Sequence, residues 1–204
     1  MSEAAPSVRH GESITGEDWY GDDLGAARFV DCTFSDVDLS ETSTSGASFE
    51  SCTFHGGRFN ASTHVATAFV ACDFRRTNFF DATLDGCKLV GSVFAGCTLR
   101  PVRVIGGRWS GVTMRGANLS GLDLSGVDLS EADLSLANLT GTVLRDANLA
   151  GATLRETDLT RTDLRGASLD RVDLTVATLK DTRLDLAGGV LLAELAGALV
   201  DVGR

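Results

Sequence analysis

The chain has 204 residues, 43% of them hydrophobic, and a formal net charge of −10 at pH 7. This length suits a single domain, and the negative charge argues against nucleic acid or an anionic membrane as a direct partner. The sequence has no apolar run long enough to span a membrane and no basic-then-apolar leader, so a cytoplasmic protein is expected.

The first eighteen residues are polar and follow no period, which predicts a flexible N-terminal tail over residues 1–18. Ile14 and Trp19 nevertheless fit the repeat that follows them. We therefore expect the first coil to begin slightly before Leu24, with Trp19 covering its open end.

A five-residue period dominates the rest of the chain. From Leu24 to Leu184, Leu or Phe occupies 28 of 33 successive fifth positions, and no residue is inserted or deleted. We call this position the centre. A small residue stands two positions before the centre, Asp or Asn often stands directly before it, and Gly often stands two positions after it. A period of five matches neither a helix nor a plain strand.

The period describes a short extended segment followed by a corner. Side chains two apart in an extended segment share one face, so the small residue and the centre both point inward. Asp, Asn, Ser and Gly favour the corner. Four corners close a square coil of twenty residues, and the repeats predict about eight coils stacked at strand spacing of roughly 4.8 Å. The sequence therefore predicts a β-solenoid over residues 19–185.

Two parts of the frame differ in composition. The centres are rich in Phe over residues 24–99 and are all Leu over residues 119–184. Between them lie three irregular centres, Val104, Trp109 and Met114, which follow Pro101. Since proline removes a donor from a β ladder, a bulge or kink is expected here that divides the rod into two stacks.

Cysteine and histidine residues indicate no catalytic or metal site. All five cysteines occupy the small inward position: Cys32, Cys52, Cys72, Cys87 and Cys97. Their spacing matches no zinc site, so we interpret them as buried apolar residues. His64 lies at a centre one coil after Thr44, which predicts a buried polar pair with its own hydrogen bonds. We expect a protein that is not an enzyme and has no cofactor or metal.

The period ends at Asp185, a candidate helix N-cap. Residues 186–204 are rich in Ala and Leu, and Leu192, Leu195, Leu199 and Val202 follow a helical spacing. This segment either caps the last coil or joins two chains. We favour a homodimer formed through five apolar residues: Val190, Leu191, Leu192, Leu195 and Leu199.

Acidic residues concentrate in two zones. Residues 17–50 hold nine acids and one base, and residues 118–144 hold four acids and no base, whereas residues 51–117 hold three acids and eight bases. Solvated surface charge is the simplest explanation for any one of them. The candidate contact residues in these zones are Asp22, Asp23, Asp31, Asp36, Asp38, Glu41, Glu50, Asp123, Asp128, Glu131 and Asp133.

The uninterrupted period resembles the pentapeptide-repeat proteins over about residues 19–185. This resemblance implies an all-β, right-handed quadrilateral β-helix. Within the family, the segment Gly91–Pro101, the polar breaks at Thr44 and His64 and the C-terminal helical segment are similar to the actinobacterial Mfp-type fluoroquinolone-resistance proteins. The basic middle of the chain departs from a uniformly negative surface.

The resemblance implies a function. Mfp-type proteins bind DNA gyrase, a type II topoisomerase, as mimics of DNA; they inhibit supercoiling and protect the enzyme from quinolones. Carboxylates at repeat spacing would then stand in for phosphates in a basic groove. Two alternatives stay open: a self-immunity factor against a natural gyrase toxin, and a structural or adaptor β-helix unrelated to topoisomerases.

Overall fold

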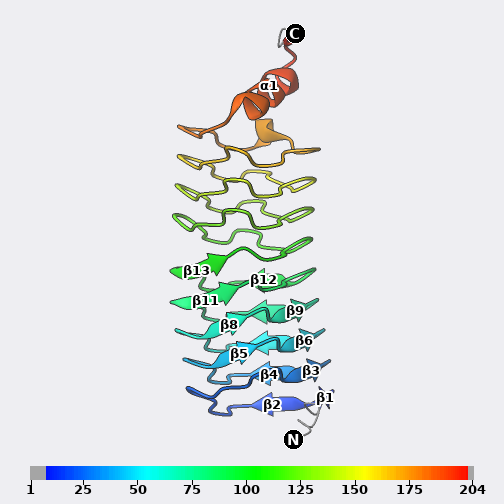
Figure 1. The fold of residues 1–204 in the computed structure, drawn as a ribbon, viewed down its shortest axis with the longest axis vertical. Coiled ribbons are helices and arrows are strands. Elements are labelled where there is room, and N and C mark those ends of the chain that lie inside the picture. Colours follow the sequence, from blue (N-terminus) through cyan, green and yellow to red (C-terminus); the bar gives the residue numbers. More distant parts are fainter. Residues whose placement is uncertain (1–7, 202–204) are drawn as a thin grey trace, which may run out of the picture.

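The protein is a four-sided, right-handed β-solenoid with one helix at its C-terminal end, as a computed structural model describes for residues 8–201 (Figure 1). The chain rises by one coil every twenty residues, and the coils stack into a rod. The predicted fold class is confirmed.

Three of the four sides carry parallel sheets. The first contains β1 (Val8–His10), β3 (Arg28–Val30), β6 (Ser48–Glu50) and β9 (Ala68–Val70). The second contains β2 (Ser13–Thr15), β4 (Thr33–Ser35), β7 (Thr53–His55), β10 (Asp73–Arg75) and β12 (Val93–Ala95). The third contains β5 (Ser43–Ser45), β8 (Thr63–Val65), β11 (Ala82–Asp85) and β13 (Val102–Ile105). Paired strand residues are twenty positions apart in sequence, as are Phe34 and Phe54.

Regular strands span about five turns and end at Ile105. Beyond this point isolated parallel bridges join the coils with the same twenty-residue register, as far as the bridge between Asp163 and Arg183. A short 3-10 helix, η1 (Leu174–Val176), and the helix α1 (Leu186–Leu195) follow. The frame predicted from the sequence therefore continues through both kinds of coil.

The predicted tail is wrong over residues 8–18. Strands β1 and β2 lie there and pair with β3 and β4, and Ile14 is buried.

Arg9 stands at the centre position, which hides the repeat in the sequence. Its guanidinium carbon lies 5.5 Å from the ring of Phe29 and 5.8 Å from that of Trp19. Arg9, rather than Trp19, therefore covers the first aromatic layer, and the rod exceeds the predicted eight coils. Residues 1–7 lie outside the described part.

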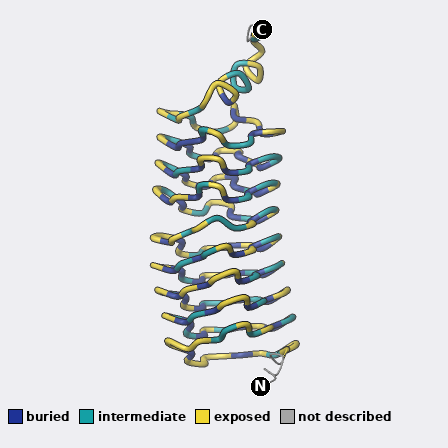
Figure 2. Tube along the Cα trace, in the orientation of Figure 1, coloured by how far each residue is buried: buried dark blue, intermediate teal, exposed yellow. Residues whose placement is uncertain are grey.

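The core is a column of centre side chains inside the rod, and the corners are exposed (Figure 2). In the first half, Phe rings one coil apart stack face to face. Phe54 lies 4.6 Å from Phe34 and 4.8 Å from Phe74 between ring centroids. Face-to-face and edge-on contacts of this kind stabilise aromatic cores beyond simple burial.

The predicted polar pair is present inside this column. His64 Nδ1 lies 2.7 Å from the Thr44 hydroxyl, and His64 Nε2 lies 3.0 Å from the Ser62 hydroxyl. The Ser62 hydroxyl donates to the carbonyl of Phe59 at 2.7 Å. Ser62 must therefore accept from Nε2–H, and Nδ1 accepts from Thr44. Complete burial lowers the pKa of His64 to about 4, so the ring is neutral and its hydrogen bonds are satisfied.

The predicted irregularity after Pro101 is an opening in the ladder. Bridges Val93–Thr113 and Arg108–Asp128 keep the register on two sides. Within residues 8–201, no bridge joins residues 96–106 to residues 116–126. Figure 1 shows the coil of β13 and the coil above it standing apart on the left side. The two stacks are thus continuous on one half of the circumference and separated on the other.

The C-terminal helix begins as predicted and ends earlier. The Asp185 carboxylate accepts the N–H of Gly188 at 2.9 Å and caps α1. Leu191 and Leu192 pack against the core. The helix ends at Leu195, so Leu199 lies beyond it, and Val202 lies outside the described residues. Across residues 8–201, no helix has the length and apolar character needed to cross a membrane.

Candidate partner-binding surface

The acidic residues before the centres have a local structural role. Among residues 8–201, every Asp or Asn in this position except Asp73 accepts the backbone N–H two residues later through a side-chain oxygen. Examples are Asp123 with Ser125 at 3.0 Å and Asn138 with Thr140 at 3.0 Å. The complete set is Asp18, Asp23, Asp38, Asn78, Asn118, Asp123, Asp128, Asp133, Asn138, Asn148, Asp158, Asp163 and Asp173.

This hydrogen bond determines the local conformation of the backbone. A carboxylate or amide that holds the N–H two residues later forms an Asx turn, which bends the chain directly after the centre. None of these described positions lies in a regular strand. The carboxylate of Asp73 instead binds the guanidinium of Arg75, and that segment is strand β10. The bond also orients each side chain at the rod surface.

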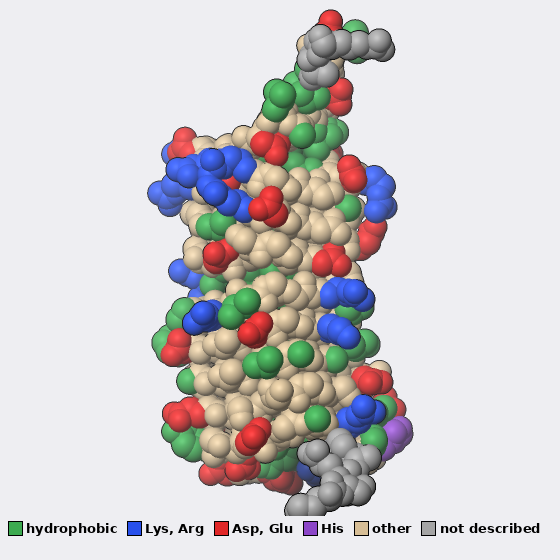
Figure 3. All heavy atoms as spheres, viewed as in Figure 1, with side chains coloured by type: hydrophobic (Ala, Val, Ile, Leu, Met, Phe, Trp, Pro, Cys, Tyr) green, Lys and Arg blue, Asp and Glu red, His purple; other side chains and the backbone are tan. Residues whose placement is uncertain are grey.

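The first acidic zone surrounds the N-terminal coils. Asp23 lies on the β5 side and Glu50 lies in β6, whereas Asp31, Asp36 and Glu41 occupy corners with positive φ. Asp22, the remaining predicted residue near Asp23, is exposed. Red side chains accordingly border the lower end of the face in Figure 3. The structure therefore brings these acids together at one end of the rod, but not on one side of it.

Several of these carboxylates already have partners. Asp38 binds Arg58 of the next coil at 2.8 Å, and this guanidinium is the main reason that the pKa of Asp38 falls to about 2. Asp31 Oδ2 lies 3.2 Å from His10 Nε2, and Glu41 accepts the hydroxyl of Tyr20 at 2.5 Å. Among the described residues, the side chains of Asp22, Asp36 and Glu50 have neither an ion pair nor a hydrogen bond. These three carboxylates are open to a partner.

The second acidic zone forms a partial ring. Asp123, Asp128 and Asp133 are five residues apart and lie on three successive sides of the same coil. Asp128 also accepts the side-chain amide of Asn148 at 2.9 Å. Partial burial acts to raise the pKa of Asp133, but the hydrogen bonds from Ser135 and the charge of Arg115 together outweigh it, so the pKa is lowered. These three carboxylates face different directions around the rod.

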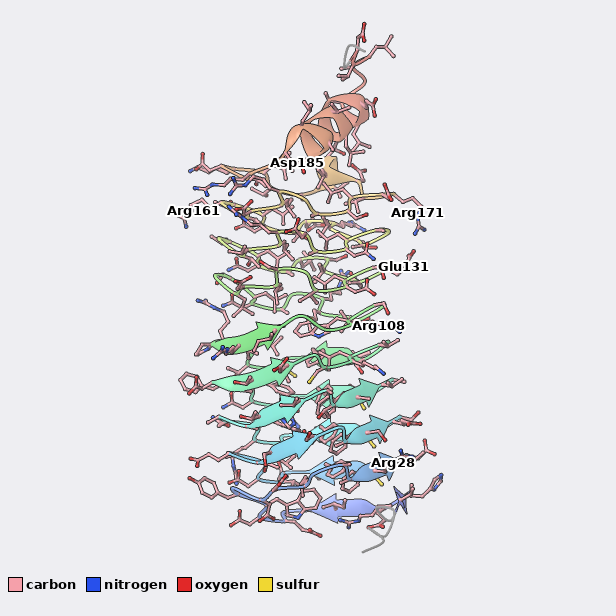
Figure 4. The ribbon with its side chains drawn as sticks, viewed as in Figure 1. Arg28, Arg108, Glu131, Arg161, Arg171 and Asp185 are labelled. Atoms are coloured by element: carbon pink, nitrogen blue, oxygen red, sulfur yellow. The ribbon has the colours of Figure 1, made fainter. Side chains whose placement is uncertain are left out.

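A base from a distant part of the sequence reaches this zone. The sequence from residue 118 to 144 holds no base, but Arg171, two coils away, binds Glu131 at 2.7 Å (Figure 4). Gly151 lies between them, and a Cβ there would come 2.5 Å from a Glu131 oxygen. The glycine leaves room for Glu131 along the edge of the rod. The sequence pattern that could have indicated this ion pair is an acidic residue followed by a glycine twenty residues later and by a basic residue forty residues later.

A second pairing that sequence reasoning missed lies near the C-terminal end. Arg145 and Arg165 both bind the carboxylate of Asp163 at 2.7 Å, and Asp163 is nearly buried between them. Figure 3 shows Lys and Arg side chains gathered on this edge, where Figure 4 places Arg161. Arg145 stands eighteen residues before Asp163 and Arg165 stands two residues after it, and these spacings are the sequence pattern that could have indicated the ion pairs.

The cysteines of the described chain lie at the small inward position of the repeat. Residues 8–201 contain no group of three or more His, Cys, Asp or Glu side chains that could hold a metal ion. Cys32, Cys52, Cys72 and Cys87 are buried and free, and Cys97 is half-buried. Burial raises the pKa of Cys87 to about 11, so its thiol is protonated and unreactive.

The C-terminal apolar residues divide into two groups. Leu191 and Leu192 pack on the last coil, and Val190 is half-buried. Leu195 is 41% exposed and Leu199 is fully exposed. Part of the predicted dimerisation set therefore caps its own solenoid, and part remains open to solvent.

Comparison with known proteins agrees with this architecture. The profile of a family described as pentapeptide repeats matches in eight copies, over residues 23–63, 67–100, 102–135, 110–146 and 143–181. The pentapeptide repeat protein MfpA of Mycobacterium tuberculosis is 37% identical over 94 residues, which are 44% of this chain and 40% of that protein. The match thus spans less than half of MfpA.

Solved structures extend the similarity of fold to nearly the whole chain. A trypsin-treated form of QnrB1, described as a plasmid-mediated fluoroquinolone resistance protein, has a TM-score of 0.85 at 21% identity and covers 97% of this chain and 100% of its own. Full-length QnrB1 has a TM-score of 0.79 at 20% identity, with 94% and 100% coverage.

Proposed function

Because this chain belongs to the pentapeptide-repeat family, we propose that it binds DNA gyrase as a mimic of duplex DNA, inhibits supercoiling and protects the enzyme from quinolones. The similarity to MfpA and the resistance role printed for QnrB1, which has the same fold, support this class of partner. The protein acts by binding, in the cytoplasm, without a cofactor.

The observation that carries the proposal is the fixed orientation of surface carboxylates. One oxygen of Asp123 and one oxygen of Asp133 accept a backbone N–H of the same coil. The turn therefore anchors each carboxylate on a rigid rod instead of leaving it on a free side chain. A basic groove that binds DNA meets phosphates at fixed spacing, so anchored carboxylates are better mimics than flexible ones.

A homodimer completes the proposal. Exposed Leu195 and Leu199 extend from the C-terminal end, and contact with a second copy would remove them from water. Joining two C-terminal ends would double the length of the rod. Replacing both leucines by Glu should halve the mass measured by light scattering, whereas replacing Leu186, which is exposed on the first turn of α1, serves as the control.

The deciding experiment adds purified protein to a gyrase supercoiling assay with and without a quinolone. The key variant replaces Asp123, Asp128 and Asp133 by Asn. Asparagine keeps the turn hydrogen bond and removes the charge, as Asn118 and Asn138 demonstrate in this chain. We expect the wild type to inhibit and protect at micromolar concentrations, and the triple variant to lose at least about tenfold in potency.

The matched control is Asp173→Asn, which lies near the C-terminal end with the same local bond. No effect of the wild-type protein on gyrase, together with no salt-sensitive capture of either gyrase subunit, would contradict the proposal and favour an adaptor role.

A further inference from the structure

The opening between residues 96–106 and 116–126 leaves backbone groups without their usual partners. In a regular coil, the N–H of the centre and the N–H of the following corner donate to the coil above. On the same side of the rod, Leu39 donates to Arg58 at 2.7 Å and Glu41 donates to Asn60 at 2.8 Å. The coil above donates back, as Arg58 does to the carbonyl of Val37 at 3.0 Å.

Across the opening these bonds are missing. Among the hydrogen bonds of residues 8–201, the N–H groups of Leu99 and Val104 have no acceptor in the coil above. The N–H groups of Asn118 and Asp123 have no acceptor in the coil below. Both flanks are intact, since Phe94 donates to Thr113 at 2.9 Å and Trp109 donates to Asp128 at 2.7 Å. Strand β13 is therefore an edge strand in the middle of the rod.

The sequence is adapted to this separation. Pro101 occupies the corner position whose N–H would donate across the opening, and proline has no N–H. Leu122 occupies the small inward position, and it is the one Leu in that position from residue 27 to residue 182. Leu122 is buried. A larger side chain fills the additional space between the coils, so the interior stays closed while the two backbone edges remain apart.

The opening has room for a ligand at its entrance. A surface groove of about 260 Å³ lies between the two coils and is lined by Cys97, Leu99, Arg115, Ala117 and Asn118. The interior behind it holds a cavity of only about 10 Å³. Space for an added chain therefore lies at the surface, next to the free N–H groups of Leu99 and Asn118, and not in the core.

The border of the opening is basic. Arg100, Arg103 and Arg115 are exposed, and among the described residues none of them forms an ion pair. The Arg100 guanidinium reaches across to Gly121 and lies 3.7 Å from the place of a Cβ on that residue. Asp123 is the acid on the facing edge of the coil above. Net positive charge thus surrounds two rows of unpaired donors and acceptors.

We propose that this opening binds an extended acidic segment of a partner protein, which adds as a β-strand between the two coils. An added strand that bends with the corner at Pro101 supplies acceptors to Leu99 and Val104 on one edge and to Asn118 and Asp123 on the other. Alternate side chains point inward and outward. Apolar residues of the segment contact Leu99 and Ala117 in the groove, and its carboxylates meet the arginines. This site adjoins the acidic surface proposed for gyrase at Asp123, but its arginines and its backbone groups lie outside that surface.

The probe is a fluorescein-labelled peptide of about ten residues with alternating Glu and Val, matching the length of one edge. Fluorescence anisotropy measures its binding to the full chain. One control peptide has the same sequence with N-methylated backbone amides on alternate residues, which keeps the charge but cannot pair as a strand. We expect N-methylation to weaken binding at least about tenfold, because several backbone hydrogen bonds are lost.

Charge reversal tests the arginines. The double variant Arg100→Glu, Arg103→Glu should bind the peptide at least about tenfold more weakly. The matched control is Arg28→Glu, Arg161→Glu, which reverses two exposed arginines far from the opening (Figure 4) and should change binding less than about twofold. Circular dichroism verifies that both variants are folded.

Amide hydrogen exchange in the wild-type protein gives an independent measurement. Asn118 and Asp123 should exchange faster than Asn138 and Val143, whose N–H groups donate to the coil below, and the peptide should slow the first pair selectively. Absence of binding at millimolar peptide, equal binding of the N-methylated peptide, or unchanged exchange at Asn118 and Asp123 would each overturn the proposal.

Discussion

The two halves of the solenoid build the same coil in different ways. Before residue 100, Phe rings stack along the axis and three-residue strands line the sides. After residue 107, Leu fills the core, and Asx turns replace strands beside isolated bridges. The twenty-residue register therefore does not depend on regular strands. Asx bonds at many of these turns accompany the same register where the ladder is reduced to single bridges.

Truncation of one core residue in each half gives the largest expected effect. Phe54 and Leu134 occupy the same column four coils apart, and both are fully buried. Phe54→Ala should lower the free energy of unfolding by roughly 4 kcal/mol and Leu134→Ala by roughly 3 kcal/mol, because the larger ring leaves the larger cavity. Chemical denaturation measures both. Equal losses would mean that ring stacking adds nothing to the first half.

Acid should weaken the first half through His64. The folded pKa of His64 is about 4, below the ordinary value of 6.5, so the unfolded chain binds a proton that the folded chain does not. Stability is complete above pH 6.5 and falls as the pH is lowered towards 4, by about 3 kcal/mol. The variant His64→Phe should lose this dependence. Denaturation of both proteins between pH 7 and pH 4 is the measurement, and parallel curves would contradict the assignment.

Two substitutions at one Asx turn of the second half distinguish the contribution of the turn hydrogen bond from that of the carboxylate charge. Asp133→Ala removes the bond to the N–H of Ser135 and should cost about 1 kcal/mol. Asp133→Asn keeps that bond and should cost much less. The difference between the two variants in thermal denaturation therefore measures the turn. If both variants lost the same amount, the charge of Asp133 and not its turn would stabilise the coil.

The smallest effect is expected at the ion pair that spans two coils of the second half. Glu131 and Arg171 are both largely exposed, and exposed pairs contribute little. Glu131→Gln should change the free energy of unfolding by less than about 1 kcal/mol, and salt should reduce this difference further. A double-mutant cycle with Arg171→Gln isolates the pair. A coupling well above that value would show that edge contacts stabilise this half.

The sequence predicts whatever the period controls. The inward cysteines, the neutral pair at His64 and the cap at Asp185 all follow from position in the repeat. Arg9 was missed because a charged residue at a centre looks like the end of a repeat. Contacts between outward residues, such as Glu131 with Arg171, depend on side-chain reach across coils and not on the period. The opening beside β13 needed the structure because Pro101 alone indicates a break but neither its extent nor its side.

The square cross-section gives insertions a geometric meaning. One additional pentapeptide leaves every centre residue pointing inward, since the frame is kept, but it rotates all later sides by a quarter turn. Asp163 would then no longer stand in line with the side that carries Asp123. Only whole coils of twenty residues preserve the surface pattern, and each adds one strand spacing of about 4.8 Å. The rod can therefore lengthen by whole coils while the residues on each of its sides stay aligned.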